Sequence, residues 1–217
     1  MLSISQIVER IIAHQPFLAE ALVEGLINVS SLARKIQPEV EQHFGDEVKS
    51  GAIVMSINRL IPKMKGKISH LGSEVVVRDI IVRSQLIDYT YKNSSMLIER
   101  HTDLLRAIGP NQEFFYTMVQ GVFESNLVVS QTLAEQVETI FEEESLLSKS
   151  GHLSAVTLKL PDVNSQQAGF YYHILKSIAW AGINIREVIS TTNEFTIVVN
   201  DDAIDKTFSV LKNLGQS

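Results

Sequence analysis

Cysteine is absent from this chain of 217 residues. Its absence excludes disulfide bonds, thiol nucleophiles and thiolate metal sites together. No apolar run approaches the roughly 18 residues that a membrane-crossing helix needs, so we expect no membrane partner. The opening stretch MLSISQIVERIIAHQ has neither the basic start nor the cleavage site of a secretory signal, which makes a cytoplasmic location the default expectation.

Arrangements of residues that carry catalysis are also missing. The six histidines fall in no recognised metal-ligand spacing, and there is neither a glycine-rich phosphate loop nor a nucleophile elbow. We therefore expect no enzymatic activity, no metal and no cofactor. The acidic run Glu142-Glu143-Glu144 is most simply a solvated linker.

The charge is unevenly distributed along the chain. Residues 1–70 hold 8 Lys and Arg against 7 Asp and Glu, whereas residues 71–217 hold 11 against 18. Basic residues crowd into the stretch RLIPKMKGK, at Arg59, Lys63, Lys65 and Lys67. Such a cluster can meet phosphates, although the cations also suit the C-terminal end of a solvated helix.

The first 70 residues have the apolar spacing of helices. The first helix is expected to begin at a Ser3 or Ser5 cap, and the second at Pro16. Ser30 or Ser31 is expected to cap a short third helix that stops before Pro38. A fourth helix over 47–64 completes an all-helical domain, residues 1–70.

This helical domain is small and has tight connections, which favours a helix-turn-helix-like arrangement. Residues 29–36 would then support a groove-entering helix over 47–64. DNA contacts are expected from an exposed face that includes Lys49, Ser50, Ser56, Asn58, Arg59, Lys63 and Lys65. A dimerisation or protein-docking module is the alternative, because a net charge of +1 is weak for a DNA-binding domain.

Beyond residue 70 the chain repeats itself. Residues 71–150 follow the order strand, helix, strand, strand, helix, and residues 151–217 follow it again. The stretch ESNLVVS matches EFTIVVN, so that Glu124 corresponds to Glu194. Strands are expected over 74–91, 113–121, 124–130, 152–160, 183–190 and 194–200. Two such units predict an α+β fold with paired sheets and a seam between them.

The second unit resembles an ACT domain, specifically the regulatory ACT domains of aspartate kinases. The matching pieces are a loop that ends at Gly169, a helix that ends at Gly182, the strand start Ile183-Asn184-Ile185, a Thr-Thr-Asn-Glu turn and the strand EFTIVV. The whole chain is similar to a group of predicted regulators of amino-acid metabolism with a helix-turn-helix-like domain ahead of ACT domains and no kinase domain. The resemblance implies two ferredoxin-like βαββα units.

The resemblance also implies a small-molecule effector, usually an amino acid, held between paired ACT domains. Its ligand would be clasped by the loop of one unit and the second strand of its neighbour, at Asp162, Val163, Asn164, Gln167, Ala168, Gly169, Ile183, Asn184 and Ile185. Gly169 at a helix start leaves N–H groups for a carboxylate, and Asp162 offers a charge for an ammonium. Allosteric regulation of transcription, or of a protein partner, is the expected output.

Two features depart from the ACT pattern. The first unit has Lys92-Asn93-Ser94-Ser95 where the second has its glycine loop, so its own site is expected to be lost. The sequence printed ends after the last helix, without a fourth strand, and the exposed sheet edge then needs cover from the other repeat or another subunit. We therefore expect at least a dimer. A ligand-free assembly module is the alternative to a sensor.

Overall fold

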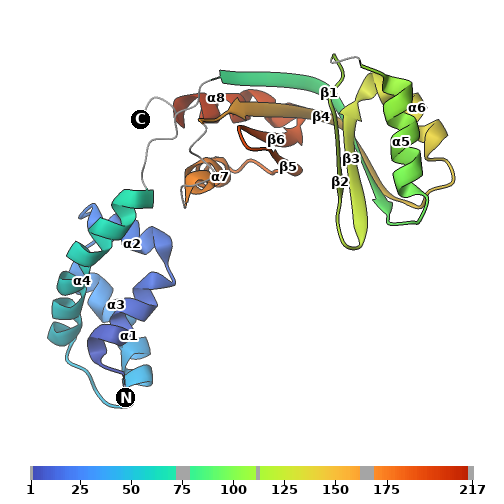
Figure 1. Ribbon diagram of the computed structural model, residues 1–217. Helices are drawn as coiled ribbons and strands as arrows, with labels where there is room; N and C mark the ends of the chain where they lie inside the picture. The colour runs from blue at the N-terminus through green and yellow to red at the C-terminus, as the bar shows by residue number, and fades with distance from the viewer. Residues whose placement is uncertain (1, 72–78, 111–112, 162–168, 215–217) are drawn as a thin grey trace. The chain divides into compact units, whose positions relative to one another are not determined.

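Helices form the first part of the chain, and strands with helices form the rest (Figure 1). The computed structural model describes residues 2–71, 79–110, 113–161 and 169–214. These residues belong to two compact units, Met1–Ser73 and Glu74–Ser217. The chain is therefore an α+β protein, and each unit is described by itself.

The described residues of the first unit form helices and the short connections between them. Ser3 caps its first helix as expected, in a capping box with Gln6. One apolar core, which includes Ile7, Ile53 and Ile57, joins all of its helices. The helices are α1 (Ile4–Ala13), α2 (Pro16–Val23), α3 (Val29–Phe44) and α4 (Ser50–Leu71).

Helix α3 differs from its prediction at both ends. Its cap is Asn28, whose Oδ1 accepts the N–H of Ser31 at 2.9 Å, so Ser30 and Ser31 already lie inside the helix. The expected stop before Pro38 was also wrong, because α3 runs on to a left-handed Gly45. Apolar residues on both sides of the proline are buried in the same core, and this packing outweighs the lost backbone bond.

The second unit repeats the expected order of strand, helix, strand, strand and helix. Strand β4 begins at residue 146 instead of 152 and runs through the boundary expected between 150 and 151, while β5 begins at 187 instead of 183. The first series is β1 (Asp79–Lys92), α5 (Leu97–Ile108), β2 (Tyr116–Gln120), β3 (Glu124–Ser130), η1 (Gln131–Leu133) and α6 (Ala134–Ile140). The second is β4 (Leu146–Lys159), α7 (Phe170–Trp180), β5 (Glu187–Ser190), β6 (Glu194–Asn200), η3 (Asp201–Ala203) and α8 (Ile204–Leu214).

All six strands form one antiparallel sheet in the order β2-β3-β1-β4-β6-β5. The two long strands β1 and β4 lie side by side (Figure 1). The first residues of β1 pair with the last residues of β4, where β4 also pairs with β6. The strand edge expected to need cover is therefore covered by the other repeat. In the same way, the first residues of β4 pair with β1 where β1 also pairs with β3.

Each long strand carries a bulge at its seventh residue. Gln85 in β1 has φ 57° and His152 in β4 has φ 55°, and the strand register shifts beside both. One extra residue reverses the alternation of side chains along a strand. The bulge in β1 therefore keeps Ile80 and Ile87 on one face, although an odd number of positions separates them. That face carries the helices of both repeats.

Each pair of helices covers its own half of this face (Figure 1). Helices α5 and α6 pack on a core that includes Tyr89, Leu104 and Val137. Helices α7 and α8 pack on a second core that includes Leu158, Ile178 and Leu211. Each repeat thus buries its apolar strand residues beneath its own two helices.

The opposite face is concave because the sheet curls strongly. Asn126 on β3 donates a hydrogen bond to Glu187 on β5 at 3.2 Å, although three strands separate β3 and β5 in the sheet. A small apolar cluster fills the centre of this face, where Leu86 and Leu153 are paired. The seam between the repeats is therefore a packed contact at its centre.

Candidate functional site

The described part of the expected ligand loop is its last residue. Asp162, Val163, Asn164, Gln167 and Ala168 lie outside the described residues. Gly169 immediately precedes α7 with φ 83°, a left-handed conformation that glycine adopts without steric cost.

The expected strand start lies elsewhere on the same repeat. Ile183 is buried and Ile185 half-buried, and both pack on the core beneath α7 and α8. Asn184 between them is exposed. Of these three side chains, Asn184 is the one available to a ligand.

The two parts of the expected site are not together within one repeat. Gly169 precedes α7 and Ile183 follows it, and a helix of 11 residues is about 16 Å long. A ligand that touches both must therefore be held by two repeats that face one another. The resemblance to ACT domains implied the same division between neighbouring units.

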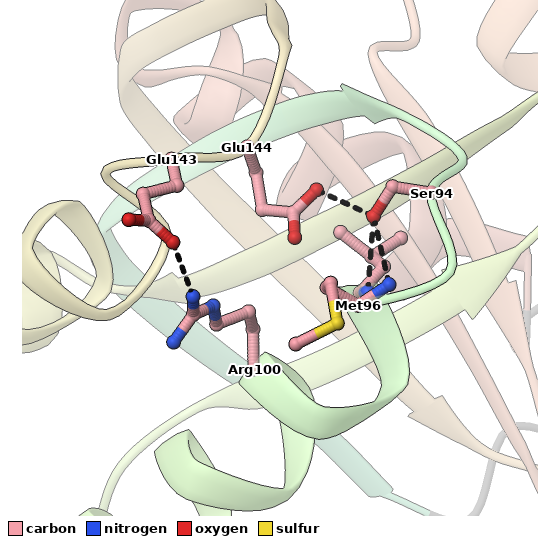
Figure 2. Close-up of polar contacts among 6 residues, drawn as sticks. Ser94, Met96, Arg100, Glu143 and Glu144 are labelled. Atoms are coloured by element: carbon pink, nitrogen blue, oxygen red, sulfur yellow. Dashed lines mark hydrogen bonds and ion pairs between the residues drawn. The ribbon is translucent and has the colours of Figure 1, made fainter.

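The corresponding loop of the first repeat is closed by its own hydrogen bonds (Figure 2). Ser94 Oγ accepts the N–H groups of Met96 and Leu97 at 3.2 and 3.1 Å, which caps α5. The same hydroxyl donates to Glu144 Oε2 at 2.7 Å. Ser94 therefore holds the start of α5 against the turn that follows α6.

Neighbouring residues extend this closure. The side chain of Asn93 donates to the carbonyl of Gly121 and accepts from Ser125 Oγ at 2.7 Å. Arg100 and Glu143 form an ion pair at 2.6 Å (Figure 2). Residues 142–144 lie in the turn between α6 and β4, where Glu142 and Glu143 are exposed as expected, but Glu143 and Glu144 also bond Arg100 and Ser94. Nothing in the local charge pattern distinguishes such a turn from a linker.

Polar side chains line the concave face beside the apolar cluster. Asn126 Nδ2 donates to Asp88 Oδ1 at 2.6 Å as well as to Glu187. Burial raises the pKa of Asp88, while the Asn126 bond and the charge of Arg186 lower it. Burial also raises the pKa of Glu187, and the charge of Asp88 adds to the rise. One amide thus bridges two carboxylates from different repeats, and sequence alone did not reveal the pair.

A second polar pair lies between α5 and β2. The rings of His101 and Tyr116 stack with centroids 5.7 Å apart. Burial lowers the pKa of His101 and raises that of Tyr116 to about 12. Both groups are therefore uncharged at neutral pH, which suits a packed aromatic contact better than acid–base chemistry.

In the helical unit the expected DNA contacts lie on or just before α4. Five of them are exposed: Lys49, Asn58, Arg59, Lys63 and Lys65. Ser50 is half-buried. Ser56 was placed on this face wrongly, because it is buried and its Oγ bonds the carbonyl of Ala52.

The expected DNA contacts on α4 form two rows. Arg59 and Lys63 are four positions apart, and Asn58 and Lys65 are seven apart, so each pair shares a flank of the helix. A groove-filling helix would use both flanks, whereas a flat protein surface would meet one of them.

Other kinds of site were sought in the same part of the chain. Among the described residues, no three His, Asp or Glu side chains converge as a metal site would require. None of the described helices combines the length and apolar character needed to cross a membrane.

No protein-family model matches the sequence, and no curated protein matches it. Solved structures do match by fold. The aspartate kinase of Clostridium acetobutylicum, described as an allosteric enzyme, is similar with a TM-score of 0.54 and 14% identity. The match covers 67% of this chain and 36% of the kinase, so the chain corresponds to about a third of that enzyme.

Two shorter chains match along almost their whole length. The regulatory subunit of aspartate kinase from Thermus thermophilus has a TM-score of 0.52 and 9% identity, over 65% of this chain and 99% of that one. A chain from the structure of aspartokinase α and β subunits has a TM-score of 0.53 and 13% identity, over 65% and 100%. Because the identities are low, the matches establish the fold alone. That fold is an ACT-like curled antiparallel sheet with helices.

Proposed function

We propose that the chain is a ligand-sensing regulatory protein that binds a small molecule, an amino acid, through two ACT units. The proposal rests on one observation: the six strands of the two repeats form a single sheet, in which each repeat supplies a strand to the other. That architecture resembles an aspartate kinase regulatory subunit over nearly the whole length of that subunit. The helical unit then takes the place of a kinase domain as the part that responds.

Each repeat is a ferredoxin-like ACT unit in this proposal. The first takes its fourth strand from the start of β4, and the second takes its own from the start of β1. A ligand that moves one unit therefore strains a strand belonging to the other. Such coupling is what an allosteric regulator requires, provided that the ligand binds two arrangements with different affinity.

The proposed ligand site joins Asp162, Val163, Asn164, Gln167, Ala168 and Gly169 of one unit to Ile183, Asn184 and Ile185 of a facing unit. The length of α7 keeps these segments apart within one repeat. The facing unit would therefore come from a second copy of the chain. This requirement is the main support for a dimer.

The first repeat offers a surface for that second copy. Exposed apolar side chains occur on both faces of its part of the sheet, at Ile98 and Leu105 on α5 and at Val119 of the edge strand β2 on the concave face. The hairpin between β2 and β3 adds Val122 and Phe123, which are 86% and 84% exposed. An edge strand with apolar neighbours is suited to pairing with an identical edge.

The output of the helical unit is proposed to be DNA binding by a helix-turn-helix-like arrangement. The exposed cations of α4 support it, and the chain would then resemble the regulators of amino-acid metabolism named above. Docking to a protein is the other output. An electrophoretic mobility shift that disappears in Lys49→Ala, Arg59→Ala and Lys63→Ala would identify DNA.

A ligand-free assembly module is the second candidate function. The closed loop of the first repeat favours it, because that loop uses the side chain of Ser94 (Figure 2) and that of Asn93 for structural hydrogen bonds. In this case the paired units would hold copies of the chain together without sensing anything.

Thermal unfolding with each of the twenty amino acids at millimolar concentration separates the two functions. We expect one amino acid to raise the midpoint by several degrees, because a ligand of the folded state stabilises it. The rise should be lost in Asn184→Ala and kept in the control Asn213→Ala on α8. A flat response to all twenty would favour the assembly module.

A further inference from the structure

The first five residues of β1 form an edge of the sheet. Asp79–Arg83 pair with β4 on one side, whereas β3 pairs with β1 only from Leu86 onward. The bulge at Gln85 separates this stretch from the part of β1 that lies between β3 and β4. A strand with a single neighbour leaves main-chain N–H and C=O groups that another strand can bond.

Apolar side chains of this edge are exposed to solvent. Ile81 is 49% exposed on the concave face and Val82 is 44% exposed on the helical face, while Ile80 packs half-buried on the core beneath α7 and α8. Charges of opposite sign stand at the two ends of the stretch, at Asp79 and Arg83. A partner strand must therefore match both the apolar centre and the charged ends.

The outward main-chain groups of this edge are those of Ile80 and Val82. In an antiparallel sheet the residues of a strand bond alternately to the neighbours on its two sides. The Leu160 N–H donates to the Asn193 carbonyl at 2.7 Å in the register of the β4–β6 pairs, so the even-numbered residues of β4 bond β6 and the odd-numbered ones bond β1. Ile80 and Val82 lie opposite even-numbered residues, which leaves their own groups pointing away from β4. The Ile80 N–H accordingly donates to the Asp79 carboxylate at 2.8 Å.

A second copy of the same stretch fits this edge in antiparallel register about Ile81. Ile80 of one copy then exchanges both main-chain bonds with Val82 of the other. Ile81 lies opposite its own counterpart on the concave face, and Asp79 lies opposite Arg83 on the same face. Opposite charges directly across a strand pair attract, and a shift of register would lose this match.

The groups involved exchange hydrogen bonds without leaving the fold. Arg83 Nη1 donates to the main-chain carbonyl of Glu113 at 2.9 Å, which uses one of the five N–H groups of the guanidinium. The Ile80 N–H passes from the Asp79 carboxylate to the Val82 carbonyl of the second copy. The carboxylate accepts from the guanidinium of the second copy in its place.

Other edges of the described sheet lack this complementarity. β2, β5 and the first residues of β4 also have a neighbour on one side alone among the described strands. β2 has no charged residue, β5 has a single glutamate, and Leu146–Ser150 of β4 have a single lysine. Symmetric pairing of any of these edges would therefore gain no ion pair.

We infer that two copies of this chain join through residues 79–83, so that their sheets continue into one another across a two-fold axis at Ile81. Both copies use the same edge, and the pair is therefore closed. The inference is independent of the proposed function, and it concerns a surface other than the one formed by α5 and β2. A chain that uses both surfaces forms an assembly larger than a dimer.

Cysteine substitution tests the register, because the chain has no cysteine of its own. In Ile81→Cys the two Cα atoms would lie about 4.5 Å apart, which is within the range that a disulfide spans. We expect mild oxidation to link this variant into a dimer at least about tenfold faster than Leu147→Cys, the matched control at an exposed position of the β4 edge. Linkage of both variants at the same rate, or of neither, would overturn the inference.

Charge exchange tests the ion pairs. In Asp79→Arg alone or Arg83→Asp alone, like charges would face one another, and sedimentation should give half the mass of the unmodified chain. The double variant Asp79→Arg, Arg83→Asp restores opposite charges, and we expect it to recover the full mass although the bond to Glu113 is lost.

Two results of the sedimentation experiment would overturn the inference. One is a mass that none of the three charge variants changes, and the other is an unmodified chain that sediments as a monomer. Sedimentation is measured without amino acids, so either result leaves the thermal-unfolding test of the proposed function unaffected.

Discussion

The loops before α5 and α7 occupy equivalent places in the two repeats and are built differently. In the first, Ser94 caps the helix and bonds Glu144, and Asn93 holds the β2–β3 hairpin. In the second, Gly169 stands before the helix without a side chain to cap it. The comparison therefore assigns structure to the first loop.

At their other ends the repeats are joined, because each long strand continues into the half of the other. The predictions below test how far the two halves depend on one another and how far they differ.

The largest effect is expected at the centre of the seam. Leu153→Ala should lower the free energy of unfolding by about 3 kcal/mol, because the side chain is fully buried beside Leu86. Since the halves share β1 and β4, chemical denaturation should show one coincident transition in Trp180 fluorescence and in the near-ultraviolet circular dichroism of the tyrosines, all five of which lie in the two repeats.

Leu147→Ala, at an exposed position of β4, is the control and should change stability little. Two separate transitions in the Leu153→Ala variant would mean that the repeats fold independently, contrary to the shared strands.

A smaller effect is expected at the closed loop. Ser94→Ala should lower the free energy of unfolding by about 1 kcal/mol, since it removes the cap of α5 and the bond to Glu144. Denaturation of Ser95→Ala, which keeps the cap, provides the comparison. If the two variants were equally stable, the hydrogen bonds of Ser94 would not have the structural role assigned to them.

The smallest effect concerns the acidic pair of the concave face. The raised pKa of Asp88 means that its ionisation opposes folding. Its stabilising contribution is complete below the unfolded pKa of about 4 and is lost as the pH rises through the raised folded value. Asp88→Asn should therefore raise the thermal midpoint at pH 7 by about 1 °C, a small gain because the group is only partly desolvated.

The gain from Asp88→Asn should disappear near pH 3, where the carboxyl is protonated in both states. Glu187→Gln should behave in the same direction, because the pKa of Glu187 is also raised. A gain that is largest at pH 3 would contradict the assignment. Asp103→Asn, on the exposed side of α5, is a suitable control.

Much of the local structure was predictable because it depends on neighbours in the sequence. The matching apolar stretches ESNLVVS and EFTIVVN predicted β3 and β6, and of the two caps expected at the start of α1, Ser3 or Ser5, the structure has Ser3. Helix α3 was predicted to stop before Pro38 because local preference disfavours proline inside a helix. Its burial on both sides of Pro38 depends on residues distant in sequence.

The sites were less predictable than the elements. Gly169 and Asn184 could be selected from a resemblance. That they lie at opposite ends of α7, and so cannot touch one small ligand within a single repeat, follows from the structure. The sequence marks Glu143 and Glu144 as solvated charges, and it does not show their partners Arg100 and Ser94, which are more than 40 positions away. The bulge at Gln85 is formed by residues that carry no signal of their own in the sequence.

The order of strands and helices was thus determined by the sequence itself, through the period of its apolar residues. Which strand completes which repeat was decided only in the tertiary structure. Pairing between β1 and β4 uses main-chain hydrogen bonds, which are the same for every residue type, over a separation of more than 50 residues. The curl that brings Asn126 to Glu187 follows from that pairing and its two bulges.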